Sequence, residues 1–142
     1  MFNLVRRDGA RENSGHFEAL KHDGSSTYLV GQVVAREAGV AVQCGGATNA
    51  KKPYGIVARD EDKNGKEVIV LRITDEMDFD VPITGANIAK VTPGFVVAIN
   101  TTDYGSVASA AATLGTDYFG AEVVDTLGAK NAGDKVTVRF RV

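Results

Sequence analysis

The sequence predicts an all-β fold, a compact antiparallel β-barrel or sandwich assembled from many short strands. Eight short runs are rich in valine, isoleucine and aromatic residues, and each is bounded by Gly, Asn, Asp or Pro. Glycine is abundant, at 16 of 142 residues, whereas proline occurs three times, and this balance favours tight turns over a disordered linker. No amphipathic run is long enough to predict a stable helix.

The expected strands follow one another from residue 28 to the end of the sequence. They cover residues 28–36, 39–44, 54–59, 67–74, 77–83, 95–100, 119–126 and 135–142. In the last run Val136, Val138 and Phe140 alternate with polar residues, which is typical of a strand with one buried face. Residues 107–114, rich in alanine, fit a short helical turn or a strand of small residues equally well.

An internal repetition suggests that the β domain consists of two related halves, residues 28–83 and 91–142. Three pairs of segments occur in the same order, at offsets of 63, 65 and 68: Gly31–Val34 with Gly94–Val97, Tyr54–Val57 with 119–123, and Val68–Arg72 with Val136–Arg139. The offset grows by five residues between the first pair and the last, and these extra residues lie in loops, where insertions cost little free energy. Chance recurrence of Gly-x-Val-Val in a β protein is the alternative.

Residues 1–27 are expected to form a polar, extended N-terminal arm outside the β domain of residues 28–142. Apolar residues are widely spaced there among charged ones, so the segment has too little apolar surface to fold alone. Such an arm can become ordered on a partner surface, and the residues expected to make that contact are Phe2, Leu4, Val5, Arg6, Arg7, Arg11, Phe17 and Leu20. The alternative is a frayed terminus without a role.

Composition and charge exclude several classes of function. A net charge of −2 and a pI near 5.7 provide no basic field for nucleic acid. No apolar stretch is long enough for a signal peptide or a membrane span, so the sequence predicts neither a membrane partner nor export. The single cysteine, Cys44, excludes an intramolecular disulfide and is expected to be a small buried hydrophobic residue.

The acidic segment at residues 60–65 resembles the first half of a calcium-binding loop. Asp60, Asp62 and Asn64 occupy three ligand positions and Gly65 the turn position, but the required glutamate is replaced by Leu71. Asn64-Gly65 is also a strong signal for a type I′ hairpin turn. We therefore expect a hairpin, with Asp60, Asp62 and Asn64 as a weak candidate cation site and no other metal site.

No motif predicts catalysis or a cofactor. His16 and His22, the two histidines, lie in the polar arm, where packing is not expected to hold a catalytic base. Asp78 and Asp80 share one strand face, but Pro82 is expected to interrupt that strand and the pair to be solvated. No phosphate-binding loop motif is present. The expectation is a protein that is not an enzyme.

Taken together, these segments resemble the capsid decoration (cement, head-stabilising) proteins of tailed bacteriophages. The resemblance is carried by Gly31–Val34, Tyr54–Ala58, Glu67–Val70 and Val91–Val97, and it extends over about residues 28–142. It implies a structural virion protein, assembled in the host cytoplasm, that binds the major capsid protein on the outer surface at junctions between shell subunits. It also implies a homo-oligomer, with a trimer favoured. The alternative is a carbohydrate- or ligand-binding β module of a phage tail or fibre.

Overall fold

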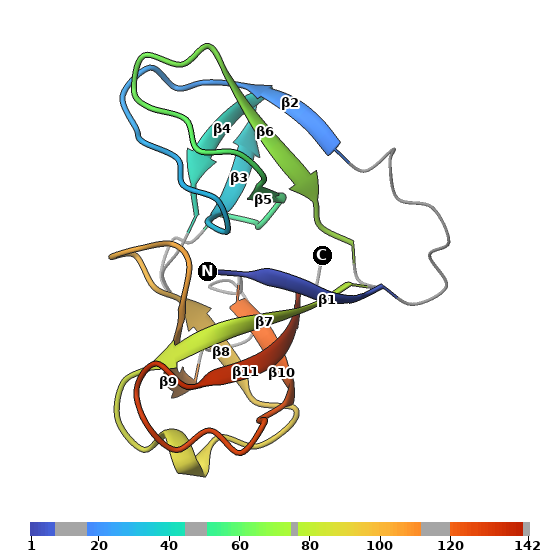
Figure 1. Ribbon diagram of the computed structural model, residues 1–142, viewed down its shortest axis with the longest axis vertical. Helices are drawn as coiled ribbons and strands as arrows, with labels where there is room; N and C mark the ends of the chain where they lie inside the picture. The colour runs from blue at the N-terminus through green and yellow to red at the C-terminus, as the bar shows by residue number, and fades with distance from the viewer. Residues whose placement is uncertain (8–16, 45–50, 75–76, 112–119, 141–142) are drawn as a thin grey trace.

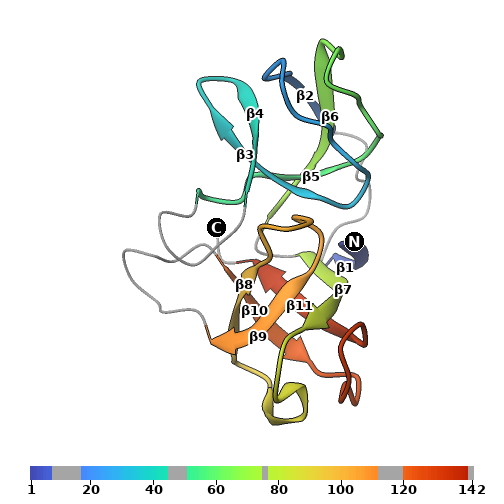
Figure 2. The same cartoon turned by 90° about the vertical axis from the view of Figure 1, so that its left-hand side faces the viewer.

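The computed structural model describes residues 1–7, 17–44, 51–74, 77–111 and 120–140, and their regular structure is almost entirely β. The strands form two barrel-like units stacked along the long axis of the molecule (Figures 1 and 2). The predicted all-β barrel class is therefore confirmed. Within the described part, the only helical element is η2 (Ile88–Lys90), a single 3₁₀ turn.

The first barrel is a closed ring of five short strands. Its members are β2 (Phe17–Lys21), β3 (Val33–Glu37), β4 (Val40–Gln43), β5 (Gly55–Val57) and β6 (Glu67–Arg72). They are arranged in the order β2-β4-β3-β5-β6, and β6 pairs with β2 to close the ring. All neighbours are antiparallel except β2 and β4, which are parallel.

The second barrel consists of β7 and the strands that follow it, which corrects the predicted division of the chain, because residues 77–83 belong to the second half and not to the first. Its members are β7 (Met77–Thr84), β8 (Val96–Ile99), β9 (Val107–Ala111), β10 (Gly120–Asp125) and β11 (Lys135–Phe140). A parallel pairing of β7 with β9 closes the order β7-β11-β10-β8-β9. A sixth strand, β1 (Asn3–Arg7), also pairs with β7. It lies along the N-terminal half of β7, on the same edge where β9 pairs with the C-terminal half.

The two barrels are equivalent in strand order, strand direction and register. In the first barrel the Gly31 amide donates to Val57 and the Val57 amide donates to Gln32. In the second, Gly94 donates to Val123 and Val123 donates to Phe95. These bonds place β3 and β8 63 residues apart, as the sequence predicts, but they place β5 and β10 66 residues apart instead of 65. The predicted offset was one residue short because it aligned the two glycines, Gly55 and Gly120, by identity rather than by hydrogen bonding.

The interiors of the barrels are built from equivalent residues. The first barrel encloses Leu20, Val34, Ala41, Val57, Val68 and Val70, and the second encloses Val81, Val97, Val107, Val123, Val136 and Val138 at the same register positions. All twelve are buried. Small β-branched residues predominate because a five-stranded ring leaves little internal volume.

The barrels share one hydrophobic core. Val33, Ala35 and Ile56 lie on the outer face of the first barrel and belong to the same buried cluster as the interior of the second. The loop after β8 reinforces this contact, because Gln32 Nε2 donates to Asp103 O at 2.8 Å and Val33 N donates to Tyr104 O at 2.8 Å. The chain therefore forms one packed unit with two barrels.

The placement of β1 and β2 corrects the expectation of a separate N-terminal arm. β1 is a strand of the second sheet, and β2 is a full member of the first barrel, paired with β6 over its whole length. Both segments are short and polar, so their own composition gives a weak strand signal. They are ordered by pairing with residues about 50 to 75 positions away in the sequence.

Two further local expectations are settled by the structure. Residues 107–111 form strand β9, and residues 112–114 lie outside the described residues. β7 continues through Pro82, which corrects the expected interruption. Ile83 N donates on the β11 side of β7, so the nitrogen of Pro82 faces the opposite edge. At that edge Pro82 lies between the residues that pair with β1 and those that pair with β9, where no amide hydrogen is needed. A proline costs little where no ladder donor is needed.

Candidate functional site

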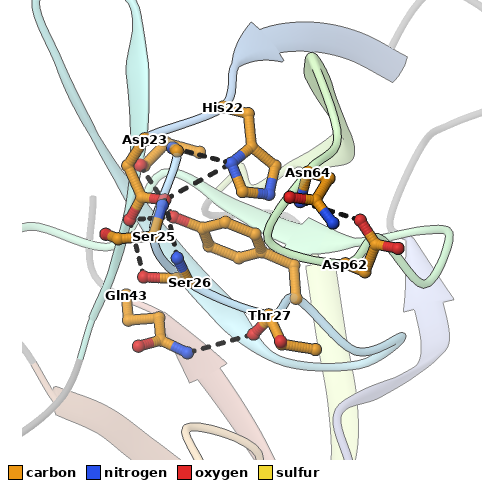
Figure 3. A network of polar contacts seen from close by, with 11 residues as sticks. His22, Asp23, Ser25, Ser26, Thr27, Gln43, Asp62 and Asn64 are labelled. Atoms are coloured by element: carbon orange, nitrogen blue, oxygen red, sulfur yellow. Dashed lines mark hydrogen bonds and ion pairs between the residues drawn. The ribbon is translucent and has the colours of Figure 1, made fainter.

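A network of polar contacts around Asp23 fixes the turn that follows β2 (Figure 3). Asp23 Oδ1 accepts hydrogen bonds from the amides of Ser25 and Ser26, and Oδ2 accepts from the Ser26 hydroxyl at 2.6 Å. The Tyr28 hydroxyl lies 2.9 Å from both Asp23 Oδ2 and Ala41 O. Asp23 thus ties the turn to a tyrosine that is fully buried in the first barrel.

The electrostatics of this network favour a charged Asp23 and a neutral Tyr28. Burial alone raises the pKa of Asp23, but hydrogen bonds from Ser26, Ser25 and Tyr28 outweigh burial and hold that pKa well below its usual value. Burial, followed by the adjacent carboxylate, raises the pKa of Tyr28 far above its ordinary value. The pair therefore acts as a structural acceptor and donor at neutral pH.

His22 is held firmly next to this network, contrary to the expectation of a mobile arm histidine. Its side chain is buried, its ring packs edge-on to Tyr28 at 5.1 Å, and Nδ1 accepts the Gly24 amide at 2.9 Å. Nε2 makes no hydrogen bond within the described residues. Because Nδ1 is an acceptor, the ring carries its hydrogen on Nε2 in the neutral form. His16 lies outside the described residues.

A polar pocket of about 290 Å³ lies beside Tyr54, where side chains from three segments converge. Its lining consists of Arg36, Lys52, Pro53, Tyr54, Arg72 and Ile73. The guanidinium groups of Arg36 and Arg72 lie 5.3 and 5.5 Å from the centre of the Tyr54 ring, within the range of cation–π attraction. The Tyr54 hydroxyl also bonds Glu18 of β2. An aromatic ring framed by hydrogen-bonding groups is suited to polar ligands.

Sequence reasoning missed this pocket because its members are distant along the chain. The one available signal was the aromatic-glycine step Tyr54-Gly55, which sets a ring beside a close backbone approach. A second, apolar hollow of about 490 Å³ lies next to η2 at the end of the second barrel. It is lined by Gly85, Ala86, Asn87, Lys90, Val91, Phe95, Ala108 and Ser109.

The acidic hairpin does not gather its side chains around a common point. Asp60 Oδ1 accepts the Val30 amide at 2.8 Å, whereas Asp62 Oδ1 accepts the Asn64 amide at 2.8 Å. Gly65 N closes the turn on Asp62 O at 3.0 Å. Within the described residues, no three His, Cys, Asp or Glu side chains are placed to hold a metal ion. Asp60 and Asp62 have separate structural roles, one tethering the hairpin to the 29–32 turn and one shaping its tip.

The residues predicted to contact a partner through an arm fall into three groups. Phe2 and Leu20 are buried, 3% and 4% exposed, and pack in the second and first barrel, respectively. They are therefore not available to a partner surface, which corrects that expectation. Leu4 and Phe17 are exposed, at 37% and 53%. The side chains of Val5, Arg6 and Arg7, and all of Arg11, lie outside the described part of the structure.

The two carboxylates of β7 are paired across the sheet rather than solvated. Asp78 is buried and receives Arg139 Nε at 2.7 Å, and Asp80 Oδ1 accepts the Thr137 hydroxyl at 2.7 Å. Each pair joins residues that lie directly opposite one another on β7 and β11. Cross-strand pairs of this kind stabilise the sheet.

Exposed apolar residues gather where the two barrels meet. Met1, Leu29 and Val30 are exposed, at 38%, 41% and 48%. Met1 packs against the backbone of Gly31, the residue that follows Leu29 and Val30 in the sequence. The sulfur of Met1 packs against Gly105 of the second barrel. We call Met1, Leu29 and Val30 the junction patch. Adjacent exposed apolar residues on a rigid body are typical of a surface that binds another protein.

Cys44 agrees with its predicted role as a small buried residue. It belongs to the shared core, and its thiol donates to Lys51 O at 2.8 Å. Burial raises the pKa of the Cys44 thiol to about 12. The thiol is therefore protonated and unreactive in the folded chain.

Comparison with known proteins adds no assignment to this geometry. No protein-family model matches the chain, and no curated protein sequence is significantly similar to it. In the described part of the chain, no helix has the length and apolar character needed to cross a membrane.

Proposed function

We propose that this chain is a non-enzymatic structural protein that decorates the outer surface of a tailed-bacteriophage capsid. In this function it binds the major capsid protein at junctions between shell subunits and stabilises the shell. The junction patch carries the proposal, because Met1, Leu29 and Val30 expose apolar side chains on a framework whose two barrels share one core. The resemblance of residues 28–142 to decoration proteins supplies the identity of the partner.

The rigidity of the framework supports this proposal. A protein that stiffens a shell must transmit force between its contacts, and a molecule with a continuous core does so without an internal hinge. The polar side chains of Asp23, Tyr28 and Asp78 are engaged in bonds that hold turns and strands together. We propose further that the protein acts as a homo-oligomer on the virion, with a trimer favoured.

The junction patch gives a direct test by co-sedimentation with purified capsids of the source virus. We expect the double variant Leu29→Ser, Val30→Ser to lose at least about tenfold in capsid affinity, because apolar contact area is replaced by hydroxyl groups. Both side chains are exposed, and the backbone bonds of these residues to Gln32 and Asp60 are retained.

Leu127→Ser is the matched control, since Leu127 is also exposed, at 52%, but lies on the hairpin between β10 and β11. We expect it to sediment with capsids like the unmodified chain. If the double variant and the control bind equally well, the junction patch is not the contact. If the unmodified chain does not bind capsids at saturating concentration, the proposed function is wrong.

A second candidate function is a carbohydrate- or ligand-binding β module of a phage tail or fibre. The observation that favours it is the Tyr54 pocket, with its aromatic ring and two guanidinium groups. Titration calorimetry with a panel of surface glycans distinguishes this candidate. Saturable binding that is lost in Tyr54→Ala, together with no capsid binding, would favour it over decoration.

A further inference from the structure

The equivalence of the two barrels exposes one difference between them, which concerns a strand edge. In the second barrel, β9 covers the C-terminal end of one edge of β7 and β1 covers the rest, opposite residues 77–80. In the first barrel, β4 likewise covers the C-terminal end of β2, at Lys21. No described strand pairs with the remainder of that edge, at Phe17–Leu20.

The direction of the backbone groups identifies the amides on this open edge. Lys21 N donates to Gly39 O, on the β4 side, whereas His22 N donates to Lys66 O, on the β6 side. In a strand with an antiparallel neighbour, the N–H and C=O groups of alternate residues point to the same edge. Phe17 and Ala19 therefore direct their backbone groups to the open edge, with Lys21. Both residues are exposed.

β1 has an open edge of its own. Among the described strands it pairs only with β7. Phe2 N donates to Gly31 O of the first barrel, so the edge that points away from β7 is occupied at Phe2 and is open from Leu4, whose backbone groups point the same way by alternation. Leu4 is exposed at 37% and Phe17, on the open edge of β2, at 53%. Each open edge thus carries one exposed apolar side chain.

We propose that the open edge of β2 pairs with the open edge of β1 from a second copy of this chain. The pairing creates a continuous sheet, in the order β6-β2-β1-β7, that crosses from one molecule to the next. Unpaired strand edges are templates for such addition. The proposal rests on the homo-oligomer included in the proposed function and names the surface that forms it, but it does not require capsid binding.

Two observations favour a second copy as the partner. β1 already occupies the equivalent edge of β7 within the chain, so its sequence fits a strand edge of this architecture. The acceptor and donor edges are also both present in every molecule, each with an apolar side chain to cover. Because the two edges differ, the contact is head-to-tail, and such contacts close into rings when the rotation between copies permits. A closed ring is consistent with the proposed trimer.

Site-specific cross-linking tests the pairing directly. Leu4→Cys and Phe17→Cys are prepared as separate proteins and mixed with a short bismaleimide reagent. The native Cys44 does not compete, because its thiol is buried. We expect the mixture to form a covalent heterodimer at least about tenfold faster than a mixture of Phe17→Cys with Leu127→Cys, in which the second site is more exposed, at 52% against 37% for Leu4, and lies between β10 and β11 rather than on β1.

Sedimentation velocity over a range of concentrations supplies the second measurement. The unmodified chain is expected to show a concentration-dependent increase in mass. Ala19→Pro, which removes an N–H from the open edge without removing a bond to β6, is expected to sediment as a monomer with an unchanged circular dichroism spectrum. Leu127→Ser is the control, because it changes an exposed side chain and leaves every backbone donor in place.

Three outcomes overturn the pairing: a monomer at every concentration, cross-linking no faster than with Leu127→Cys, or a folded Ala19→Pro variant that associates like the unmodified chain. The first outcome with intact capsid binding removes this pairing and leaves the decoration function in place. If the unmodified chain is itself monomeric and a folded Ala19→Pro loses capsid binding, the edge binds a shell protein and pairing between copies is overturned. Association without capsid binding supports the pairing and overturns the proposed function.

Discussion

Tyr28 shows how one side chain organises the first barrel. Its ring is fully buried among Leu20, Val34 and Val57, and its hydroxyl reaches both Asp23 and the carbonyl of Ala41. The equivalent position of the second barrel, 63 residues later, is Val91. There the Thr84 hydroxyl approaches Val107 O at 3.4 Å, the carbonyl equivalent to that of Ala41. In each barrel a hydroxyl group therefore donates to the carbonyl at the equivalent position, but the hydroxyl comes from a different residue.

Removal of the Tyr28 hydroxyl is expected to destabilise the fold. Tyr28→Phe leaves the Ala41 carbonyl and one Asp23 oxygen without that donor inside a low-dielectric region, at a cost of about 1–3 kcal/mol. Urea unfolding followed by circular dichroism measures the change. Tyr104→Phe is the control, because no hydrogen bond from the Tyr104 hydroxyl to a described residue is present, and its midpoint is expected to stay unchanged. Equal midpoints for the two variants would contradict a structural role for the Tyr28 hydroxyl.

Asp23 makes stability depend on pH in the acid range. Its folded pKa lies below its unfolded value, so the unfolded chain binds more protons and the carboxylate stabilises the fold at pH values above that unfolded value. This contribution is lost as the pH falls below about 4, through the unfolded pKa and towards the folded one. We expect the stability difference between the unmodified chain and Asp23→Asn to shrink over that interval in urea titrations. A difference that is constant with pH would contradict this linkage.

At the level of elements, most strands could be predicted and two could not. The eight runs from residue 28 onward alternate or cluster β-branched residues, and each of them contains a strand of the structure. β1 and β2 are five residues each within charged surroundings, so their structure depends on β7 and β6, which no local pattern reveals. The Tyr54 pocket could not be predicted for the same reason, because strand pairing alone brings Arg36 and Arg72 to the ring.

The turns before β3 and β8 provide a matched pair of glycines. Gly31 and Gly94 occupy equivalent positions with φ of 89° and 93°, a region that strains any residue with a Cβ. A Cβ on Gly94 meets no atom within 4 Å, so Gly94→Ala is expected to cost only that strain, about 1–2 kcal/mol. A Cβ on Gly31 overlaps the side chain of Met1, so Gly31→Ala is expected to be the more destabilising change in urea unfolding. Equal losses would show that Met1 can move aside without cost.

At the level of the whole molecule, the N-terminal segment joins the two barrels. The Phe2 ring packs at 5.2 Å from Phe140 and 6.3 Å from Phe79 in the second barrel, and its amide donates to Gly31 of the first. Phe2, which was expected to contact a partner, therefore packs within this chain and links its two barrels. A truncation that removes residues 1–24 deletes β1 and β2 and is expected to prevent folding.

A point substitution tests this role more finely than truncation. Phe2→Ala removes a buried aromatic ring and is expected to cost about 3–5 kcal/mol. Because Phe2 contacts both barrels, amide hydrogen exchange is expected to accelerate at Val34 and at Val97 alike. Leu4→Ala, two residues further along the chain but exposed, is expected to change stability by less than about 0.5 kcal/mol. Acceleration confined to one barrel would show that the barrels unfold independently.

The pairing of β1 with β7 also has a consequence for the order of events during synthesis. The first barrel is complete once residue 72 has left the ribosome, because all five of its strands lie between residues 17 and 72. β1 emerges before any of them but must wait for β7, and the opposite edge of β7 obtains its neighbour only when β11 appears. Nascent chains therefore carry an unpaired N-terminal strand throughout most of their elongation. Phe2 reaches its final contacts only after Phe140 of β11 has emerged, so one of the first residues to be made is among the last to be packed.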